Sequence, residues 1–266
     1  MADPNGCTVI VLAAQRAGVV NPLAQRAGVS HKCFVPICGK PLIVHVLDVL
    51  AKLGRVGQVR ISVEPEAHGE LEALLAPYRA TGMTVDCIAS STNIVESVLL
   101  AAQGQREPFV ITTADNVLLT EDMVERVLDS LVEADVAMNL AAKPSVQAVH
   151  PEAQRRFYEF RDEGYANCNL YGIAGPHAFR AAEIFREGGQ FMKNPKRLIT
   201  AFGLFNILLF RFKLLTLEGA AKRISRKFGL KFKALVPADG SQAVDVDNER
   251  TYDVAEMVLK QREAAN

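Results

Sequence analysis

The sequence lacks the charge and cysteine patterns that mark several classes of protein. Its 30 basic and 30 acidic residues cancel, so no overall charge favours nucleic acid as a partner. Its five cysteines are an odd number and include no C-x-x-C pair. This pattern argues against a disulfide framework or a structural zinc site, and it is typical of a reducing compartment.

Long apolar runs are also missing. No uncharged apolar stretch reaches the roughly 18 residues that a membrane span needs. The opening MADPNGCT lacks the basic and apolar regions of a signal peptide. We therefore expect a cytoplasmic protein that binds no nucleic acid.

The first half of the chain does contain a regular alternation of strand and helix patterns. Apolar, β-branched runs predict strands at 7–13, 56–63, 83–89, 108–114 and 135–142. Amphipathic stretches between them predict helices at 41–53, 64–78, 92–103 and 120–133. The alternation is typical of an α/β, Rossmann-like fold with a mostly parallel mixed sheet and helices on both faces.

After about residue 143 the pattern changes. We expect strands at 155–161 and 169–174 around a polar turn, helices at 176–187, 203–216 and 218–228, and a strand at 230–237. A last strand at 243–247 precedes a C-terminal helix. Because no long linker separates independent units, we interpret 1–266 as one domain with three parts: 1–142, an α+β lobe at 143–242, and a return strand and helix at 243–266.

Residues 13–32 form a long loop of small residues after the first strand, and they contain the string AQRAGV twice. In open α/β sheets, ligands bind at the carboxyl ends of the strands. Alanine and glycine let the backbone approach a ligand closely, and Arg16, Arg26 and Lys32 add positive charge. We therefore expect this loop to bind phosphate. It matches neither G-x-G-x-x-G nor G-x-x-x-x-G-K-[ST], which disfavours a Rossmann dehydrogenase and a P-loop NTPase.

Four segments in order resemble one family. They are LAAQRAG…HKCFVPICGKPLIVHVL from residue 12, SSTNIVESVLLAA (90–102), ITTADNVLLT (111–120) and AVDVDNERTYDVAE (243–256). Together they resemble the MobA-like nucleotidyltransferases, which have a glycosyltransferase-A-type fold. The sequence departs from the family pattern at Gln15 and Ala17, where glycines are usual. Glutamine cannot take positive φ as freely as glycine, so we expect the loop to follow a different path.

The resemblance implies a Mg²⁺-dependent reaction. A nucleoside triphosphate, CTP or GTP in our interpretation, is joined to a small phosphomonoester with release of pyrophosphate. The acceptor classes are sugar, polyol, lipid-headgroup and cofactor phosphates. On this interpretation 1–142 is the nucleotide-binding half and 143–242 the acceptor-side lobe. The oligomeric state is not predicted.

The candidate metal ligands are carboxylates at strand ends. Asp115 follows a nearly all-apolar strand, where a carboxylate is costly unless it binds something. Asp245 and Asp247 are two residues apart, so both would lie on one face of an extended strand. Lys32 is the expected counter-charge for the triphosphate. The resemblance implies a catalytic set of Lys32, Asp115 and Arg16. The implied nucleotide-binding set is Leu12, Ala13, Ala14, Gln15, Arg16, Arg26, Lys32, Ser91, Ser97 and Asp115.

The second half supplies the acceptor candidates. We expect Arg161, Asn167 and Asn169 to bind the acceptor, whereas Lys193, Lys196 and Arg197 fit a solvated face better than a phosphate site. Residues 205–233 mix apolar and basic side chains. Such a segment fits either a peripheral contact with anionic lipid or a core helix beside a solvated basic helix.

Two other functions stay open at this point. A glycosyltransferase of the same fold would use a finished sugar nucleotide, but it normally carries D-x-D where this chain has TADN with a single aspartate. A non-catalytic nucleotide-binding regulator is suggested by Gln15 and Ala17 in place of glycines. A regulator would bind the triphosphate without Mg²⁺-dependent release of pyrophosphate, whereas a nucleotidyltransferase would release it.

Overall fold

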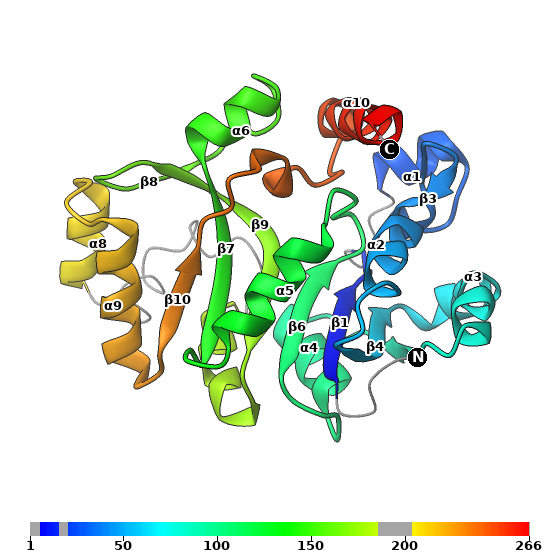
Figure 1. Cartoon of the computed structure of the whole chain (residues 1–266), viewed down its shortest axis with the longest axis horizontal. Coiled ribbons are helices and arrows are strands. Elements are labelled where there is room, and N and C mark those ends of the chain that lie inside the picture. The colour runs from blue at the N-terminus through cyan, green and yellow to red at the C-terminus, as the bar shows by residue number, and fades with distance from the viewer. Residues whose placement is uncertain (1–5, 16–20, 186–203, 266) are drawn as a thin grey trace.

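The computed structural model describes residues 6–15, 21–185 and 204–265. The predicted site residue Arg16, together with Ala17, Lys193, Lys196 and Arg197, lies outside the described residues. An eight-stranded sheet forms the centre of the molecule (Figure 1). Seven of its strands run in the order β10 (Phe232–Leu235), β7 (Val136–Ala142), β9 (Gly164–Ile173), β6 (Phe109–Thr113), β1 (Cys7–Leu12), β4 (Val56–Val63) and β5 (Val85–Ala89).

Most neighbouring strands are parallel. β1 pairs in parallel with β4 and β6, β4 pairs in parallel with β5, and β10 pairs in parallel with β7. β9 is antiparallel to both β6 and β7, and the short β8 (Tyr158–Glu159) pairs with β9. The predicted α/β fold with a mostly parallel mixed sheet is confirmed, and the second half of the chain builds part of that sheet.

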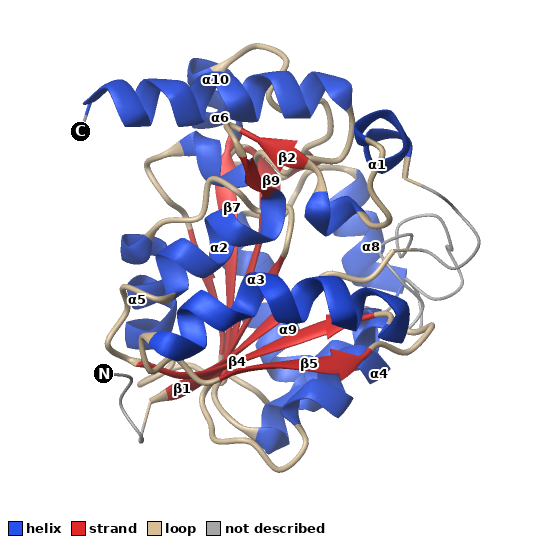
Figure 2. Ribbon diagram, turned by 90° about the vertical axis from the view of Figure 1, so that its right-hand side faces the viewer, coloured by secondary structure: helices blue, strands red, loops and turns tan. Residues whose placement is uncertain are grey.

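Helices cover both faces of the sheet (Figure 2). Val9 and Val11 of β1 point into a core shared with α2 (Leu42–Leu50), α3 (His68–Ala80) and α5 (Glu121–Ser130). Ile10, between them, points to the opposite face, toward α4 (Ile94–Ala102) and the 3-10 segment η3 (Pro176–Phe185). This alternation of neighbouring side chains is the period of two that a strand imposes.

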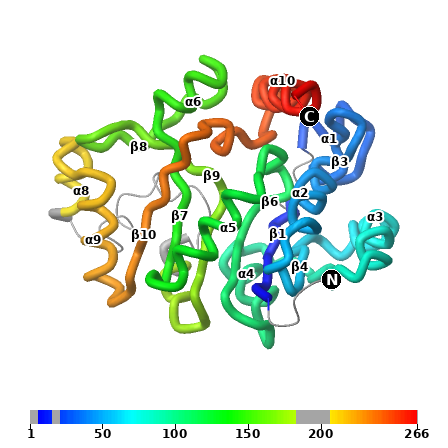
Figure 3. Tube along the Cα trace, in the orientation of Figure 1, coloured from blue at the N-terminus to red at the C-terminus, as the bar shows by residue number. Residues whose placement is uncertain are grey.

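Several short elements and the long helix α10 lie at the carboxyl ends of the strands. They are α1 (Pro22–Ala27), η1 (Lys32–Phe34), the hairpin of β2 (Pro36–Ile37) and β3 (Lys40–Pro41), α6 (Lys143–Val149), η5 (Gly240–Ala243) and α10 (Glu249–Ala265). The outer edge near β10 carries α8 (Leu204–Arg211) and α9 (Leu217–Phe228), and η2 (Pro65–Ala67) precedes α3. Figure 3 shows α10, at the end of the chain, beside α1 near its beginning.

Residues 243–247 form no strand, although all five lie in the described part of the chain, so the predicted return strand is wrong. Val244 and Val246 are buried alternately, as in a strand, but they pack in a cluster with α10 and the turn after β6. The Val246 N–H donates to the Asp115 carbonyl (3.2 Å) rather than to a sheet neighbour. Alternating burial alone therefore did not distinguish a strand from an extended segment lying over a loop.

Other boundaries also differ from prediction: α8 ends at Arg211 instead of 216, β10 covers only Phe232–Leu235, and α6 was not predicted. The polar turn is shorter than expected, because β9 begins at Gly164, and only two residues of 155–161 pair as β8. The 13–32 loop contains α1, where Asn21 caps the first turn, Pro22 occupies it, and Gly28 ends the helix with φ of 67°. The second AQRAGV copy thus supplies most of this helix, and most of the first copy lies outside the described residues.

Candidate active site

Lys32 lies at the centre of a cluster of acidic side chains. Its Nζ contacts Asp115 Oδ2 and also donates to Asp247 Oδ1 at 2.6 Å. The Lys32 and Asp115 side chains are only 17% and 15% exposed, whereas Asp247 is 61% exposed. The structure therefore brings together one predicted cation and two predicted carboxylates from segments that are 83 and 132 residues apart.

The end of β6 positions Asp115. The Ala114 N–H donates to the Leu12 carbonyl (2.9 Å), which ties the strand end to the end of β1. The next residue, Asn116, is buried, and its Nδ2 donates to Thr112 Oγ1 and to the Cys168 carbonyl, both at 3.2 Å. Asp115 thus projects from a turn that is fixed to strands on both sides.

The segment before α10 brings the other carboxylates to this turn. Because the Val246 N–H bonds to the Asp115 carbonyl, Asp245 and Asp247 flank the same point. Asp247 does not cap α10: Asn248 Oδ1 accepts from the Thr251 N–H (3.3 Å), and Thr251 Oγ1 accepts from the Asp247 N–H (3.0 Å). The Asp247 carboxylate therefore faces Lys32 and not the helix terminus.

The charges in the cluster change one another's pKa. Burial acts to lower the pKa of Lys32, but the attraction of Asp115 and Asp247 raises it above its usual range. Burial acts to raise the pKa of Asp115, and Lys32 more than offsets this, so the pKa lies below its usual value. Burial and the nearby charges of Asp115 and Asp247 hold the pKa of Asp245 well above its usual range. One lysine thus leaves the carboxylates in excess.

The excess of carboxylates over lysine raises the question of whether these residues suit a divalent cation. Among the described residues, no group of three Asp, Glu, His or Cys side chains surrounds a single metal position, since Lys32 lies between the carboxylates. Asp115 Oδ1 is nevertheless buried with no hydrogen-bond partner in the described part of the chain. Carboxylate oxygens are the ligands Mg²⁺ prefers. The donor chemistry of Asp115, Asp245 and Asp247 therefore suits Mg²⁺, although the described carboxylates are not gathered around one position.

Gln15 holds the two ends of the predicted phosphate loop together. Its Nε2 donates to the Ser30 carbonyl and its Oε1 accepts from the Lys32 N–H, both at 3.2 Å. Its own N–H donates to Glu64 Oε1 at 2.7 Å. A glycine has no side chain for the first two bonds. The glutamine that departs from the family pattern therefore supports the backbone of Lys32 from across the loop.

The other residues predicted to bind the nucleotide lie in different places. The chain leaves the sheet after Leu12, where the Ala13 N–H donates to the Ser62 carbonyl, and Ala14 is exposed beyond it. Arg26 lies on α1 and pairs with Glu249 at the start of α10 (3.2 Å), with its guanidinium over the Tyr252 ring. Arg26 thus joins α1 to the start of α10, and Glu249, its partner there, is two residues after Asp247.

Ser91 and Ser97 shape the turn before α4. Ser97 is buried, its Oγ accepts from the Ser91 N–H (2.9 Å), and it donates to the Ser91 carbonyl (3.2 Å). The Ser91 hydroxyl donates to Glu96 Oε2 (2.7 Å). Both predicted hydroxyls are therefore bonded within the turn, where they hold its backbone in place.

A bulge in β9 turns Asn169 toward the acidic cluster. Between the β7–β9 pairs Met138–Tyr171 and Leu140–Asn167, β9 has two more residues than β7. Asn169, within this bulge, has φ of 47°, a left-handed conformation that asparagine tolerates better than most residues. Its side chain acts to lower the pKa of Asp245, against the larger effects of burial and of the neighbouring carboxylates. Asn169 therefore places β9 next to the cluster.

Two buried asparagines that sequence reasoning missed support this bulge. Asn116 donates to the Cys168 carbonyl, and Asn139 Nδ2 donates to the Leu170 carbonyl at 3.1 Å. These carbonyls flank Asn169 on either side. The signal in the sequence was Asn139 itself, a polar residue in an apolar strand that must find a partner when buried.

The other acceptor candidates lie along β9. Asn167 Nδ2 donates to Asn169 Oδ1 (2.8 Å) and contacts the Tyr171 hydroxyl, so a row of polar groups follows alternate residues of the strand. Tyr171 was not predicted. Arg161 lies in the turn before β9, where its N–H donates to the Leu215 carbonyl (2.8 Å). The structure bonds the two predicted asparagines to each other beside Asp245, and among the described residues it shows no hydrogen bond between them and Arg161.

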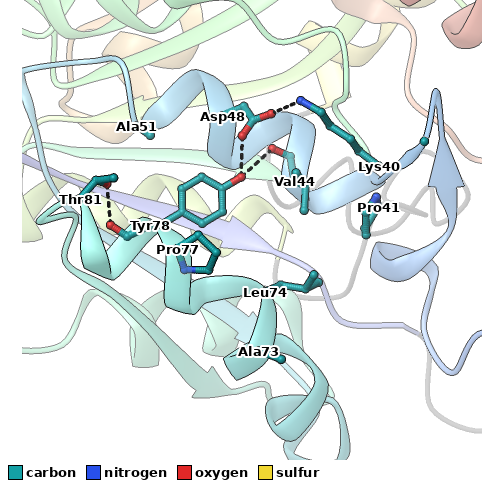
Figure 4. Close-up of a pocket in the computed structure, with 11 residues that line it drawn as sticks. Lys40, Pro41, Val44, Asp48, Ala51, Ala73, Leu74, Pro77, Tyr78 and Thr81 are labelled. Atoms are coloured by element: carbon teal, nitrogen blue, oxygen red, sulfur yellow. Dashed lines mark hydrogen bonds and ion pairs between the residues drawn. The ribbon is translucent and has the colours of Figure 1, made fainter.

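A separate hollow of about 510 Å³ lies between α2 and α3 (Figure 4). Tyr78 points across it, and its hydroxyl donates to Asp48 Oδ1, while Lys40 donates to Asp48 Oδ2, both at 2.6 Å. None of the predicted site residues lines this hollow. Lys40 therefore belongs to the outer surface of α2 and not to the cluster around Lys32.

This fold and cluster agree with what comparison of the sequence shows. The family model of the MobA-like NTP transferase domain matches residues 9–163, more than half of the chain. The chain belongs to the MobA-like NTP transferase family and is a transferase of the nucleotidyltransferase type. The resemblance predicted from the four ordered motifs is confirmed.

One curated relative and two solved structures extend the comparison. A bifunctional enzyme IspD/IspF of Chelativorans sp. (strain BNC1) is 31% identical over 139 residues, which cover 49% of this chain and 31% of that protein. The chain thus matches about a third of the relative's length.

A hypothetical transferase from Thermus thermophilus has a TM-score of 0.72 at 24% identity, covering 93% of this chain and 99% of that one. The 4-diphosphocytidyl-2C-methyl-D-erythritol synthase from Anaerococcus prevotii has a TM-score of 0.60 at 10% identity, covering 97% and 100%. At these identities the structures show the shared fold.

Proposed function

We propose that the chain is a Mg²⁺-dependent nucleotidyltransferase that joins a nucleoside triphosphate to a small phosphomonoester and releases pyrophosphate. The observation that carries this proposal is the cluster of Lys32 with Asp115, Asp245 and Asp247 at the carboxyl ends of the strands. Ligands of open α/β sheets bind at this edge. Family membership supports the same class of reaction.

The proposed reaction needs positioning more than a strong base. An oxygen of the acceptor phosphate forms a bond to the α-phosphorus, and the bond from that phosphorus to the pyrophosphate oxygen breaks. The second pKa of a phosphomonoester is about 6, so the acceptor is largely a dianion at neutral pH. The main barrier is then the approach of two polyanions, which fixed positive charge reduces.

Lys32 supplies the fixed positive charge of the chain itself. Its raised pKa keeps the ammonium protonated at neutral pH, and Gln15 holds its backbone. We propose that the ammonium leaves the carboxylates for the triphosphate when the nucleotide binds. Asp115, with Asp245 or Asp247, would hold Mg²⁺, which when bound neutralises phosphate oxygens. Arg16 and Arg26 remain proposed phosphate contacts.

The acceptor would bind along β9. Asn169 and Asn167 connect the carboxylate cluster to the Tyr171 hydroxyl, and amide and phenol groups of this kind recognise hydroxyl groups. A hydroxylated acceptor phosphate, such as a sugar or polyol phosphate, fits this row better than an apolar one. Arg161 is proposed to reach the acceptor from the turn before β9.

The nucleotide base is proposed to lie at the turn held by Ser91 and Ser97, with CTP or GTP as substrate. The name of the Anaerococcus prevotii enzyme refers to a diphosphocytidyl compound, which supports CTP as the first choice. All five cysteines are free, which supports the proposed cytoplasmic location. None of the described helices is both long enough and apolar enough to cross a membrane.

The test is a screen of pyrophosphate release. CTP, GTP, ATP and UTP are each combined with sugar, polyol and headgroup phosphates, with and without Mg²⁺. We expect one pair to react, and Asp115→Ala to abolish that reaction. Lys40→Ala is the control, because Lys40 lies at the separate hollow. Calorimetric binding of a triphosphate without pyrophosphate release from any pair would instead support a nucleotide-binding regulator.

A further inference from the structure

The C-terminal end of α8 exposes apolar side chains on an unusual scale for this molecule. Leu208, Phe212 and Leu214 are 44%, 66% and 56% exposed. Among the described residues, eight large apolar side chains are exposed, and three of them fall within these seven positions. Scattered single exposures need no explanation, but a group of them marks an interaction surface.

The helical period places these residues on one face. Leu208 and Arg211 are three residues apart on one side of α8, and Phe212, directly after the helix, donates its N–H to the Leu208 carbonyl (2.9 Å) and continues this stripe. All three are exposed. The opposite side of the helix packs inward, where the Phe210 ring meets Phe160 with 5.2 Å between their centres. A solvated helix normally presents polar residues outward. Here the outward stripe is apolar with a cation inside it.

The turn after α8 adds to the same surface. Lys213 has φ of 54°, and the Leu214 N–H donates to the Leu209 carbonyl (2.8 Å), as in a Schellman helix end. Glycine is the usual residue at this left-handed position, because a side chain is strained there. This chain places a lysine there instead, between the exposed Phe212 and Leu214.

The charge around this surface is positive. Lys213 pairs with Glu159 (3.1 Å), but Lys143 lies 3.9 Å from the same carboxylate, so one acidic group faces two lysines. Residues 205–233 hold eight basic residues and one acidic residue, a net charge of +7. Because the whole chain is neutral, the remainder carries −7. Arg211 and Lys213 lie among the exposed apolar side chains, and the other six basic residues follow on α9, which lies beside α8, on β10 and between the two (Figure 1).

From this pattern we propose that the end of α8, with Leu208, Arg211, Phe212, Lys213 and Leu214, binds the surface of an anionic lipid membrane. Apolar side chains flanked by lysine and arginine are the composition that holds an interfacial helix at such a surface. Contact of one such cation with an anionic leaflet contributes about 1 kcal/mol, or about fivefold in binding. The proposal concerns attachment and does not depend on the proposed reaction.

The experiment is sedimentation of the full chain with vesicles of phosphatidylcholine alone or mixed with phosphatidylglycerol. We expect binding to the mixed vesicles, at least about tenfold weaker in the double variant Phe212→Asp and Leu214→Asp. Arg211→Gln should weaken it by about fivefold. Val132→Asp is the matched control, because Val132 is 82% exposed on the turn after α5. It should bind like the unchanged chain.

Several outcomes would overturn the proposal. They are absence of binding to mixed vesicles, equal binding to both vesicle types, and equal loss with Val132→Asp. Circular dichroism and pyrophosphate release of the Phe212 and Leu214 variant separate a surface effect from unfolding. A dimer of the unchanged chain in light scattering that this variant converts to a monomer would assign the surface to a second copy instead.

Discussion

Two lysine–carboxylate groups in this molecule have opposite characters. Lys32 is buried among three aspartates that come from two distant segments. Lys40 is 52% exposed and faces Asp48 eight residues away, and the other oxygen of Asp48 accepts from Tyr78. In the second group each charge has its partner. In the first the negative charges are in excess, and one buried oxygen has no partner in the described part of the chain.

The difference separates a candidate functional site from a surface ion pair. Exposed pairs typically contribute less than about 1 kcal/mol and need no further partner. Buried carboxylates without a counter-charge lower the stability of the fold. A cluster of them is therefore a candidate binding site for a cation that would supply the missing positive charge. The imbalance of charge, more than the presence of a lysine, is the reason we propose that the polyphosphate and its cation bind at the first group.

The first prediction compares removal of Lys32 with removal of Lys40. Lys32→Ala should lower pyrophosphate release by about 100-fold or more, because it removes the fixed charge that faces the phosphates. Removing one partner of a buried ionic group also costs about 3–5 kcal/mol of the free energy of unfolding. Lys40→Ala should leave turnover within about twofold, since Lys40 lies at the separate hollow and not in the cluster. Steady-state kinetics and urea unfolding measure both.

The effect of Mg²⁺ on the melting temperature tests the same cluster without measuring activity. In Lys32→Ala the carboxylates repel one another without a cation, so Mg²⁺ should raise the melting temperature more than it does in the unchanged chain. Near-normal turnover in Lys32→Ala, or equal effects of Mg²⁺ on both proteins, would contradict the assignment of the cluster.

The second prediction concerns the support of the cluster from β9. Asn139→Leu leaves the Leu170 carbonyl without its donor, so the bulge that directs Asn169 should relax. We expect the KM for the acceptor to rise about tenfold, with the KM for the triphosphate nearly unchanged. Ser130→Ala, which removes a buried hydroxyl bond to the Val127 carbonyl on α5, is the control for stability alone. Equal changes in both KM values would show a general structural effect.

The third prediction, with the smallest effect, tests the exposed pair. Burial acts to raise the pKa of Asp48, but hydrogen bonds from Lys40 and Tyr78 lower it below its usual value. A depressed pKa contributes stability above the unfolded value of about 3.9, and this is lost as pH falls through the folded value. Asp48→Asn should therefore lower the free energy of unfolding by about 1 kcal/mol at pH 7 and by less below pH 4. Urea titrations at pH 7 and 3.5 measure it, and a constant difference would be the contrary result.

The sequence predicted the parts of the site that depend on local pattern. Lys32 and Asp115 follow strands whose carboxyl ends meet at one edge, so their proximity could be inferred from the order of the elements. The bulge at Asn169 could not, because it depends on how β7 and β9 pair across the sheet. The misassigned strand at 243–247 has the same cause. Its alternating valines are buried, as they would be in a strand, but the surface that buries them is a loop and a helix.

The contact of α10 with α1 has a consequence for how the molecule is made. Arg26 meets Glu249 and Tyr252, and Asp247 lies just before them, so a segment late in the chain completes a cluster to which Lys32 belongs. During synthesis the sheet strands up to β7 are available long before Asp247 leaves the ribosome. A chain truncated before Asp245 would keep Lys32 and Asp115 but lack the second carboxylate segment, so we expect it to lack the proposed nucleotide turnover.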